Sequence, residues 1–220
     1  SLALSLCPVP TFLRMPLATR CLPEVCNAMK TVEIQSQRRV FDGFFKIDEV
    51  EFCHQRRDGS MSPPLRRLHL NRGDGVTAVL HNPARQTLLF VRQFRFSTYE
   101  NGPGWLLETV AGVVESGQTP EESVILEIRE ETGYRVRDLE LVTSFYLTPG
   151  GSSERIYLFY AEIEEADREH EGGGLPEEGE DIEVVELTLD QAWRALESGE
   201  IADAKTIVGL QWLSRRLLDA

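Results

Sequence analysis

Residues 112–134 read GVVESGQTPEESVILEIREETGY, and this stretch decides the fold. Thr119 and Pro120 are typical of a helix N-terminus, where threonine caps the first turn and proline takes the first helical position. A glutamate three residues after the threonine completes a capping box. Gly133 can adopt the left-handed conformation that commonly ends a helix. The pattern therefore predicts a helix over Thr119–Thr132.

Three carboxylates of this helix, those of Glu127, Glu130 and Glu131, share one sector, because each helical residue advances by about 100°. The core is expected on a different sector, formed by Val124, Ile125 and Ile128. Like charges at this spacing destabilise a helix by about 0.2–0.5 kcal/mol per pair, and the last turn of a helix favours cations. A solvated acidic face is one interpretation. A site for Mg²⁺ or Mn²⁺ is the other, because oxygen ligands suit hard cations.

The segment before the helix supports the cation interpretation. Residues 108–112 read ETVAG, and the glycine lets backbone carbonyls approach whatever the helix binds. No histidine accompanies the carboxylates, which argues against zinc. A second acidic and glycine-rich stretch, residues 164–181, predicts a long loop, and such loops are either functional or disordered.

The rest of the chain mixes predicted strands with two further helices. Strands are expected at Phe44–Val50, Leu65–Leu70, Gly75–Leu80, Gln86–Phe96, Leu139–Leu147, Ile156–Ile163 and Ile182–Leu187. The further helices are expected at Leu189–Leu196 and Asp203–Leu218. Strands mixed with three helices, without internal repeats, indicate an α/β or α+β domain.

The chain is acidic, with 23 Lys and Arg against 36 Asp and Glu and a formal net charge of −13. This charge excludes broad electrostatic binding to nucleic acid, because phosphate neutralisation needs a surplus of cations. No apolar stretch reaches the roughly 18 residues of a membrane span, so no membrane partner is expected. The cysteines at positions 7, 21, 26 and 53 show no CxxC spacing. A reducing, cytoplasmic compartment is therefore expected.

Gly112, Gln118 and residues 126–134 together resemble the Nudix box. The pattern of that family is Gly-x5-Glu-x7-Arg-Glu-U-x-Glu-Glu-x-Gly-U, where U is a bulky apolar residue. Gln118 replaces the first glutamate and Leu126 replaces the arginine, while every other fixed position of the pattern holds. Because that arginine braces the carboxylates in relatives, Leu126 predicts a less preorganised metal site.

Outside the box, the chain is similar to the ADP-ribose pyrophosphatase branch of the Nudix hydrolases, from about Phe41 to Leu213. The matching segments include GFF at 43–45, RQFR at 92–95, LLETVAG at 106–112, TPGGSSER at 148–155 and EGEDI at 178–182. The resemblance implies an α/β (α+β) Nudix fold. In that fold a mixed β-sheet is sandwiched between helices, and an N-terminal lobe of antiparallel strands precedes it.

Three regions are expected along the chain. Residues 1–28 are rich in leucine and proline and would form a leader or a disordered extension, with an organellar transit peptide as the alternative. Residues 29–72 would form the N-terminal strand lobe, and the resemblance implies that this lobe mediates a homodimer. Residues 73–220 would form the Nudix hydrolase domain.

The resemblance implies a hydrolase that depends on Mg²⁺ or Mn²⁺ and cleaves the pyrophosphate of nucleoside diphosphate sugars. ADP-ribose, which gives AMP and ribose 5-phosphate, is the substrate expected first. GDP-mannose is the alternative, since the pyrophosphatases that cleave it share the RQFR and PGG segments and the triple glycine 172–174. A catalytically weakened nucleotide-sugar-binding module is the third hypothesis, motivated by Gln118 and Leu126.

The resemblance also implies roles for single residues. The metal ligands would be the Ala111 carbonyl and the carboxylates of Glu127, Glu131 and Glu180. Glu178 would be the catalytic base in the acidic loop, with Glu130 acting close to the metal; a merely solvated acidic loop is the alternative. The substrate-binding residues would be Phe44, Phe45, Arg67, Arg72, Arg95, Val113, Thr148, Gly150 and Glu154. Surface arginines, and phenylalanines of a core or dimer interface, are the alternatives for those residue types.

Overall fold

The computed structural model describes residues 31–219, so the predicted leader at residues 1–28 lies outside the described residues. The chain divides into two compact units. Of the described residues, the first unit combines 31–37 with 50–67, and the second combines 38–49 with 68–219. In the described range, no helix has both the length and the apolar character that crossing a membrane requires.

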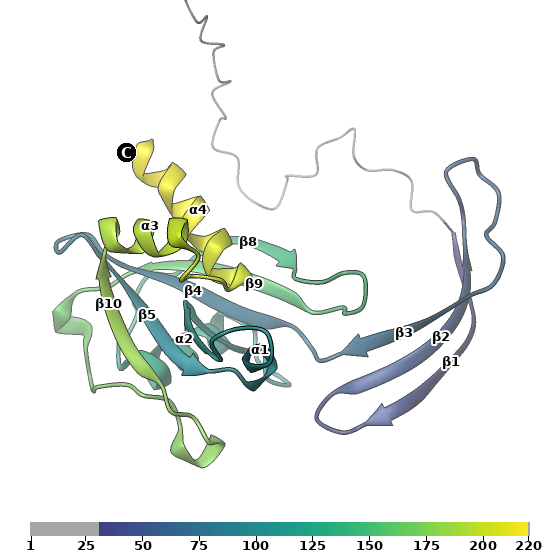
Figure 1. Cartoon of the computed structure of the whole chain (residues 1–220), viewed down its shortest axis with the longest axis horizontal. Helices are drawn as coiled ribbons and strands as arrows, with labels where there is room; N and C mark the ends of the chain where they lie inside the picture. The colour runs from purple at the N-terminus through teal and green to yellow at the C-terminus, as the bar shows by residue number, and fades with distance from the viewer. Residues whose placement is uncertain (1–30, 220) are drawn as a thin grey trace, which may run out of the picture. The chain divides into compact units, whose positions relative to one another are not determined.

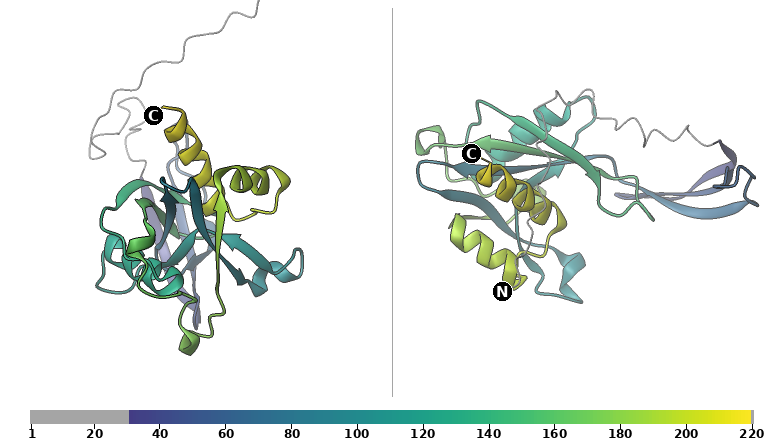
Figure 2. Two further views of the ribbon diagram at one scale, coloured as in Figure 1. Left: turned by 90° about the vertical axis from the view of Figure 1, so that its left-hand side faces the viewer. Right: turned by 90° about the horizontal axis from the view of Figure 1, so that it is seen from above.

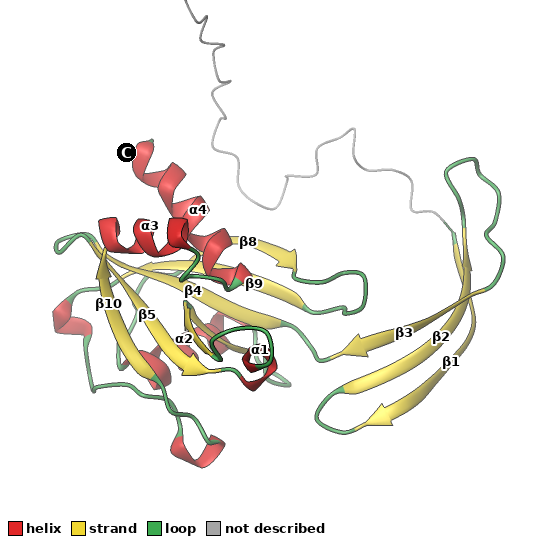
Figure 3. Ribbon diagram, viewed as in Figure 1, coloured by secondary structure: helices red, strands yellow, loops and turns green. Residues whose placement is uncertain are grey.

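The N-terminal strands form a three-stranded antiparallel sheet in the order β1-β2-β3 (Figure 3). The strands are β1 (Val32–Asp42), β2 (Lys46–His54) and β3 (Leu65–Asn71). β1 is an edge strand whose residues are all exposed, including the apolar Ile34 and Phe41. An edge of this kind offers unpaired backbone groups to another chain. Cys53, on β2, is buried and free.

The second unit contains a seven-stranded sheet whose main path runs β10-β5-β4-β9-β8 (Figure 1). β4 and β9 are parallel and the other strand pairs are antiparallel, so the sheet is mixed. Two short strands extend it, because β6 pairs with β5 and β7 pairs with β4. The strands are β4 (Gly75–Asn82), β5 (Thr87–Phe94), β6 (Trp105–Glu108), β7 (Val110–Val113), β8 (Glu140–Tyr146), β9 (Arg155–Glu162) and β10 (Glu183–Thr188).

Helices cover both faces of this sheet (Figure 2). They are α2 (Pro120–Thr132), α3 (Leu189–Ser198) and α4 (Ala204–Leu218), while the short α1 (Phe96–Tyr99) follows the end of β5 and buries no residue. α2 packs on one face through Val124 and Ile128, which are fully buried. α3 and α4 pack on the opposite face, where Ala192 and Leu210 join Phe90 of β5. The layers confirm the predicted α+β fold, with a mixed sheet between helices.

All of the predicted strands and helices occur, with small shifts at their ends. The sequence pattern does not reveal β6, β7 or α1, which have 4 residues each, or β1, whose uniform exposure removes the alternation of a half-buried strand. The prediction that Ile125 faces the core is wrong, because this side chain is 40% exposed. The buried stripe of α2 instead follows Val124, Ile128 and Glu131 at helical spacing.

Candidate active site

α2 begins and ends where the sequence predicts. The hydroxyl of Thr119 accepts a hydrogen bond from the Glu122 N–H at 3.2 Å, and the Glu122 carboxylate accepts one from the Thr119 N–H at 2.8 Å. At the other end, Gly133 has a φ of 78°, and its N–H donates to the carbonyl of Arg129. The two caps fix the helix in place, and they therefore set where its glutamates lie.

Glu131 is 2% exposed, and its carboxylate accepts a hydrogen bond from the Ala111 N–H at 3.3 Å. Burial, reinforced by the charges of Glu127 and Glu180, raises the pKa of Glu131 well above its ordinary value. The Ala111 hydrogen bond and the charge of Arg95 act in the opposite direction. The three carboxylates therefore lie near enough to repel one another, and a bound cation would relieve that repulsion.

Gly112 lets Glu127 lie directly against the backbone of β7. A Cβ atom added at position 112 would stand 1.7 Å from Oε1 of Glu127, a distance that no side chain tolerates. On β4, a Cβ added at Gly75 would meet the Gly112 carbonyl at 3.2 Å and Oε1 of Glu154 at 3.8 Å. Val113, half-buried, pairs with Gly75. The paired strands β4 and β7 thus bring Glu127 and Glu154 to the same part of the unit.

Arg72 connects Glu154 to Phe45. Its Nε lies 3.1 Å from Oε1 of Glu154, and its guanidinium lies 6.0 Å from the centroid of the Phe45 ring. The Phe45 ring meets the Phe44 ring edge-on, with their centroids 5.0 Å apart. Four predicted substrate-binding residues therefore form one connected group in the second unit. Arg67, by contrast, is an exposed residue of the first unit.

The turn that begins at Thr148 is hydrogen-bonded to the chain that leads to Arg72. The Gly151 N–H donates to the Thr148 carbonyl at 3.1 Å, and the Leu70 N–H donates to the Gly151 carbonyl at 2.9 Å. Thr148 and Gly150 are exposed. The backbone thus places this predicted substrate-binding turn beside the segment that carries Arg72.

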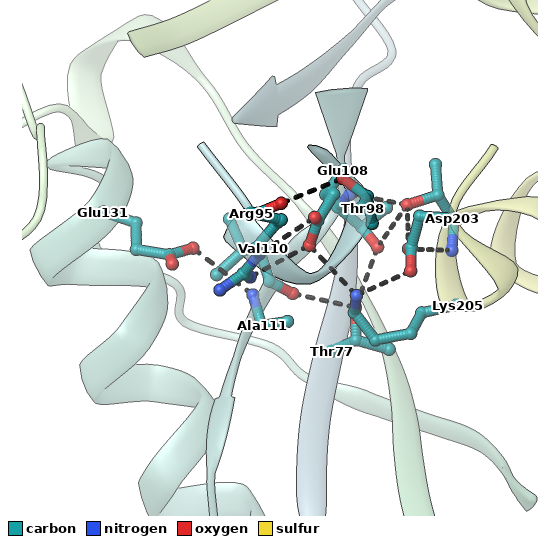
Figure 4. A network of polar contacts seen from close by, with 11 residues as sticks. Thr77, Arg95, Thr98, Glu108, Val110, Ala111, Glu131, Asp203 and Lys205 are labelled. Carbon is teal, nitrogen blue, oxygen red and sulfur yellow. Dashed lines mark hydrogen bonds and ion pairs between the residues drawn. The ribbon is translucent and has the colours of Figure 1, made fainter. Parts of the chain in front are cut away.

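Arg95 is held by a buried carboxylate. Its Nε and Nη2 donate to the two oxygens of Glu108, each at 3.0 Å, and Glu108 is 2% exposed. Lys205 donates to the same carboxylate at 3.1 Å and to Asp203 at 2.8 Å (Figure 4). Figure 4 also shows Arg95 on the side of Glu108 that faces Glu131, consistent with the influence of Arg95 on the pKa of Glu131.

The same network ties α4 to the segment that carries Ala111. Asp203 caps α4 by accepting hydrogen bonds from the N–H and the hydroxyl of Thr206 at 3.0 and 2.7 Å. The Thr206 hydroxyl accepts a hydrogen bond from the Thr109 N–H at 2.8 Å. Burial would raise the pKa of Asp203, but Lys205 and the Thr206 hydrogen bonds outweigh burial and hold that pKa below its ordinary value.

Sequence reasoning missed the pairing of Glu108 with Lys205 and did not connect Asp203 to the site. One signal was present, because Glu108 follows two leucines and precedes the buried Thr109 and Val110, and a carboxylate inside an apolar run needs a cationic partner. The partner lies 97 positions away along the chain. No local pattern predicts a contact over that separation.

The acidic loop contacts the C-terminal end of α2. The Gly174 N–H donates to the carbonyl of Glu130 at 3.1 Å. Glu180 is half-buried, and its Oε2 accepts a hydrogen bond from the Leu175 N–H at 2.8 Å. Glu178, the predicted base, is the last residue of a short 3-10 turn, and its side chain lies outside the described part of the structure.

A family model for the NUDIX domain matches residues 71–209, a range that contains α2 and the acidic loop. The chain belongs to the Nudix family. Its Nudix relatives include the GDP-mannose pyrophosphatase of Pectobacterium atrosepticum, 40% identical over 82% of this chain and 92% of that protein. They also include the GDP-mannose pyrophosphatase of Escherichia coli O1:K1, 38% identical over 78% of this chain and 89% of that protein.

A solved structure described as an ADP compounds hydrolase has the same fold. It superposes with a TM-score of 0.65 at 20% sequence identity, covering 86% of this chain and 94% of that chain. The predicted Nudix family and its fold are therefore confirmed. Nudix hydrolases generally use divalent metal ions.

The two departures from the Nudix box can be located in the structure. Gln118 accepts a hydrogen bond from the Ser123 hydroxyl at 2.8 Å, so it supports the first turn of α2. Leu126 is 42% exposed and offers no charge to the neighbouring glutamates. A cation that does act on Glu131 is Arg95, which directly follows β5.

The donors of this Nudix site fit a divalent metal ion in their chemistry. Glu127, Glu131 and Glu180 offer carboxylate oxygens, and Ala111 offers a carbonyl oxygen, which are ligands that Mg²⁺ and Mn²⁺ prefer. Over residues 31–219, no three His, Cys, Asp or Glu side chains stand in an arrangement that could already hold an ion.

Proposed function

We propose that this Nudix enzyme hydrolyses the pyrophosphate linkage of a nucleoside diphosphate sugar. The observation that carries the proposal is a pair of contacts at two glycines on the paired strands β4 and β7. Glu127 lies against Gly112, and Glu154, which pairs with Arg72, lies near Gly75. A pyrophosphate between two sugar-bearing groups requires a metal site and a site for a sugar or base next to each other. This arrangement offers both within one unit.

GDP-mannose is the substrate that the relatives support, because those at 37–40% identity are GDP-mannose pyrophosphatases. ADP-ribose is the second candidate, supported by the GFF segment at 43–45 and the TPGGSSER segment at 148–155. Hydrolysis would convert GDP-mannose into GMP and mannose 1-phosphate, or ADP-ribose into AMP and ribose 5-phosphate. The two activities therefore leave different products.

The metal ion, Mg²⁺ or Mn²⁺, would be held by the Ala111 carbonyl and the carboxylates of Glu127, Glu131 and Glu180. When bound, it supplies the positive charge that neutralises the pyrophosphate. Glu178 accepts a proton from the attacking water, whose oxygen bonds to one phosphorus while the bridging P–O bond breaks. Glu130 acts beside these groups.

The connected group around Arg72 would bind the two ends of the substrate. Phe44 and Phe45 stack on the base, since an aromatic ring can stack on the face of any nucleobase. Glu154, held by Arg72, accepts hydrogen bonds from sugar hydroxyls. Arg95 keeps 40% of its side chain exposed while it binds Glu108, so its outer edge can contact a phosphate. The remaining contacts of this proposal are Arg67, Val113, Thr148 and Gly150.

We also infer a homodimer that functions in the cytoplasm. The exposed edge strand β1 supports pairing between the N-terminal strands of two chains, within residues 29–72. The unpaired Cys53 supports a reducing compartment. A light-scattering mass near twice 24.9 kDa is expected, and a monomer mass at working concentration would contradict the dimer.

A substrate panel tests this function. The purified protein is assayed with Mg²⁺ on GDP-mannose and ADP-ribose, with products separated by chromatography. We expect Mg²⁺-dependent turnover with the larger kcat/KM for GDP-mannose. A larger value for ADP-ribose would reverse the order of the two substrates. Tight binding of both compounds without hydrolysis would contradict the enzyme and support the nucleotide-sugar-binding module.

A further inference from the structure

The triple glycine Gly172–Gly174 has a structural role that the proposed chemistry does not use. Its φ values are 77°, 115° and 78°, so all three residues adopt backbone conformations that other residues rarely adopt. The segment lies between the end of α2 and the turn that carries Glu178. The contacts that surround these three residues explain why each of them is glycine.

The first set of contacts is with the C-terminal end of α2. The last carbonyls of a helix lack partners within the helix. Here the Gly173 N–H donates to the Glu131 carbonyl at 2.9 Å, and the Gly174 N–H donates to the Glu130 carbonyl at 3.1 Å. A Cβ at position 172 would lie 2.4 Å from the same Glu131 carbonyl oxygen. The triple glycine therefore caps the end of α2 at the backbone carbonyls of Glu130 and Glu131.

The second set of contacts is with Glu180 and the residues that follow it. Its carboxylate accepts a hydrogen bond from the Leu175 N–H at 2.8 Å, and a Cβ at position 174 would lie 2.4 Å from the same carboxylate oxygen. The Ile182 N–H also donates to the Gly173 carbonyl at 3.3 Å. The chain after Glu180 thus returns to the triple glycine.

We propose that Gly172–Gly174 is a positioning element. It holds Glu180 and the turn that carries Glu178 in a fixed position relative to the backbone of Glu130 and Glu131. This inference rests on the proposed function, because it assigns the alignment of that metal site to a segment outside the Nudix box. The two groups of ligands are on separate segments of the chain. The glycine backbone bonds to Glu130 and Glu131 on one side and, through the Gly173 carbonyl, to Ile182 on the other, two residues after Glu180. Any side chain at position 174 displaces the Glu180 carboxylate from its place.

The experiment compares Gly174→Ala with Gly199→Ala. Gly199 is a matched control, because its φ is 80° and a Cβ added there meets nothing within 4 Å, so the substitution brings backbone strain without a displaced carboxylate. Calorimetry without substrate gives the Mg²⁺ affinity, assays give kcat and KM, and thermal unfolding gives stability. Loss of a supporting group around metal ligands typically weakens binding by about 10–100-fold.

We expect Gly174→Ala to weaken Mg²⁺ binding about tenfold or more and to lower kcat more than it changes KM. Gly199→Ala should keep the wild-type Mg²⁺ affinity and kcat, with a similar loss of stability. A folded Gly174→Ala protein with Mg²⁺ affinity and kcat within about twofold of the wild type would overturn the positioning role. Equal losses in both variants would do so as well.

A second measurement does not depend on the metal, on turnover or on the folding of a variant. Hydrogen exchange of the wild-type protein should show slow exchange at the Gly173 and Gly174 amides, because both donate to carbonyls of α2. Fast exchange at these amides would overturn the positioning role of Gly172–Gly174 even if the protein proves to be an active pyrophosphatase. Slow exchange in a protein without Mg²⁺ binding or turnover would instead support the contact between Gly172–Gly174 and α2 and contradict the proposed function.

Discussion

The carboxylate of Glu127 occupies the space into which any side chain at Gly112 would have to project. The added Cβ would stand 1.7 Å from Oε1 and 2.0 Å from the carboxyl carbon. Glycine at this position is therefore required by the close approach of a side chain. The arrangement brings the Glu127 side chain of α2 into contact with the backbone of β7.

Gly112→Ala tests this contact. The alanine must push the Glu127 carboxylate away, at a cost of about 1–3 kcal/mol in the free energy of unfolding, as for other overpacked sites. We expect weaker Mg²⁺ binding by about tenfold, measured by calorimetry. Gly151→Ala is the control, because its Cβ meets nothing within 4 Å. Unchanged Mg²⁺ affinity in a folded Gly112→Ala protein would remove Glu127 from the metal site.

Glu127→Gln keeps the shape of the side chain and removes its charge. We expect kcat to fall by about a hundredfold or more without unfolding, because a metal ligand is lost. In the wild type, Mg²⁺ at 100 times its dissociation constant should stabilise the fold by about 2.7 kcal/mol, seen as a rise in melting temperature. That rise should shrink in the variant. Glu121→Gln, an exposed change on the first turn of α2, is the control.

Lys205→Met tests the buried network behind the site. Glu108 would keep Arg95 but lose one of its two cations, which we expect to cost about 1–3 kcal/mol in the free energy of unfolding. Urea denaturation measures the loss. Lys205→Arg should recover part of it, since it restores the charge. Arg215→Met, an exposed change on the same helix, should stay within about 0.5 kcal/mol. A Lys205→Met protein as stable as that control would show that the pair with Glu108 contributes nothing.

The lowered pKa of Asp203 predicts a dependence of stability on pH. The carboxylate is more acidic in the folded protein than in the unfolded chain, so its contribution is complete above the unfolded pKa, about 3.9. The contribution is lost as the pH falls through the folded pKa. We expect the free energy of unfolding of the wild type to drop below about pH 4, and Asp203→Asn to flatten that part of the profile. Parallel profiles for the two proteins would contradict the assignment.

The positions of α2, α3 and α4 could be predicted from sequence because their signals are local. The caps of α2 lie within a few residues of the helix itself, and Thr119 and Gly133 make the predicted hydrogen bonds. The proximity of Glu127 to Glu131 follows from the same helical geometry. The error at Ile125 has a physical cause as well, because Glu131 takes part of the buried stripe that periodicity alone assigns to apolar residues.

The rest of the site depends on contacts between distant segments. Periodicity does not predict that Arg72 pairs with Glu154 or that Lys205 pairs with Glu108, because tertiary packing decides both. The resemblance implied Arg72 and Glu154 singly as substrate-binding residues, but neither pairing was predicted. The role of the triple glycine also depends on a long-range contact, since its hydrogen-bond partners are the carbonyls of Glu130 and Glu131.

The network beneath Ala111 has a consequence for protein engineering. Residues 112–134 contain the whole Nudix box, but the Ala111 N–H that meets Glu131 comes from the preceding segment, and that segment is bonded to Thr206 at the start of α4. Transplanting the box alone into a foreign scaffold would leave these supports behind. A graft meant to bind metal would therefore have to include both β7 and the first turn of α4.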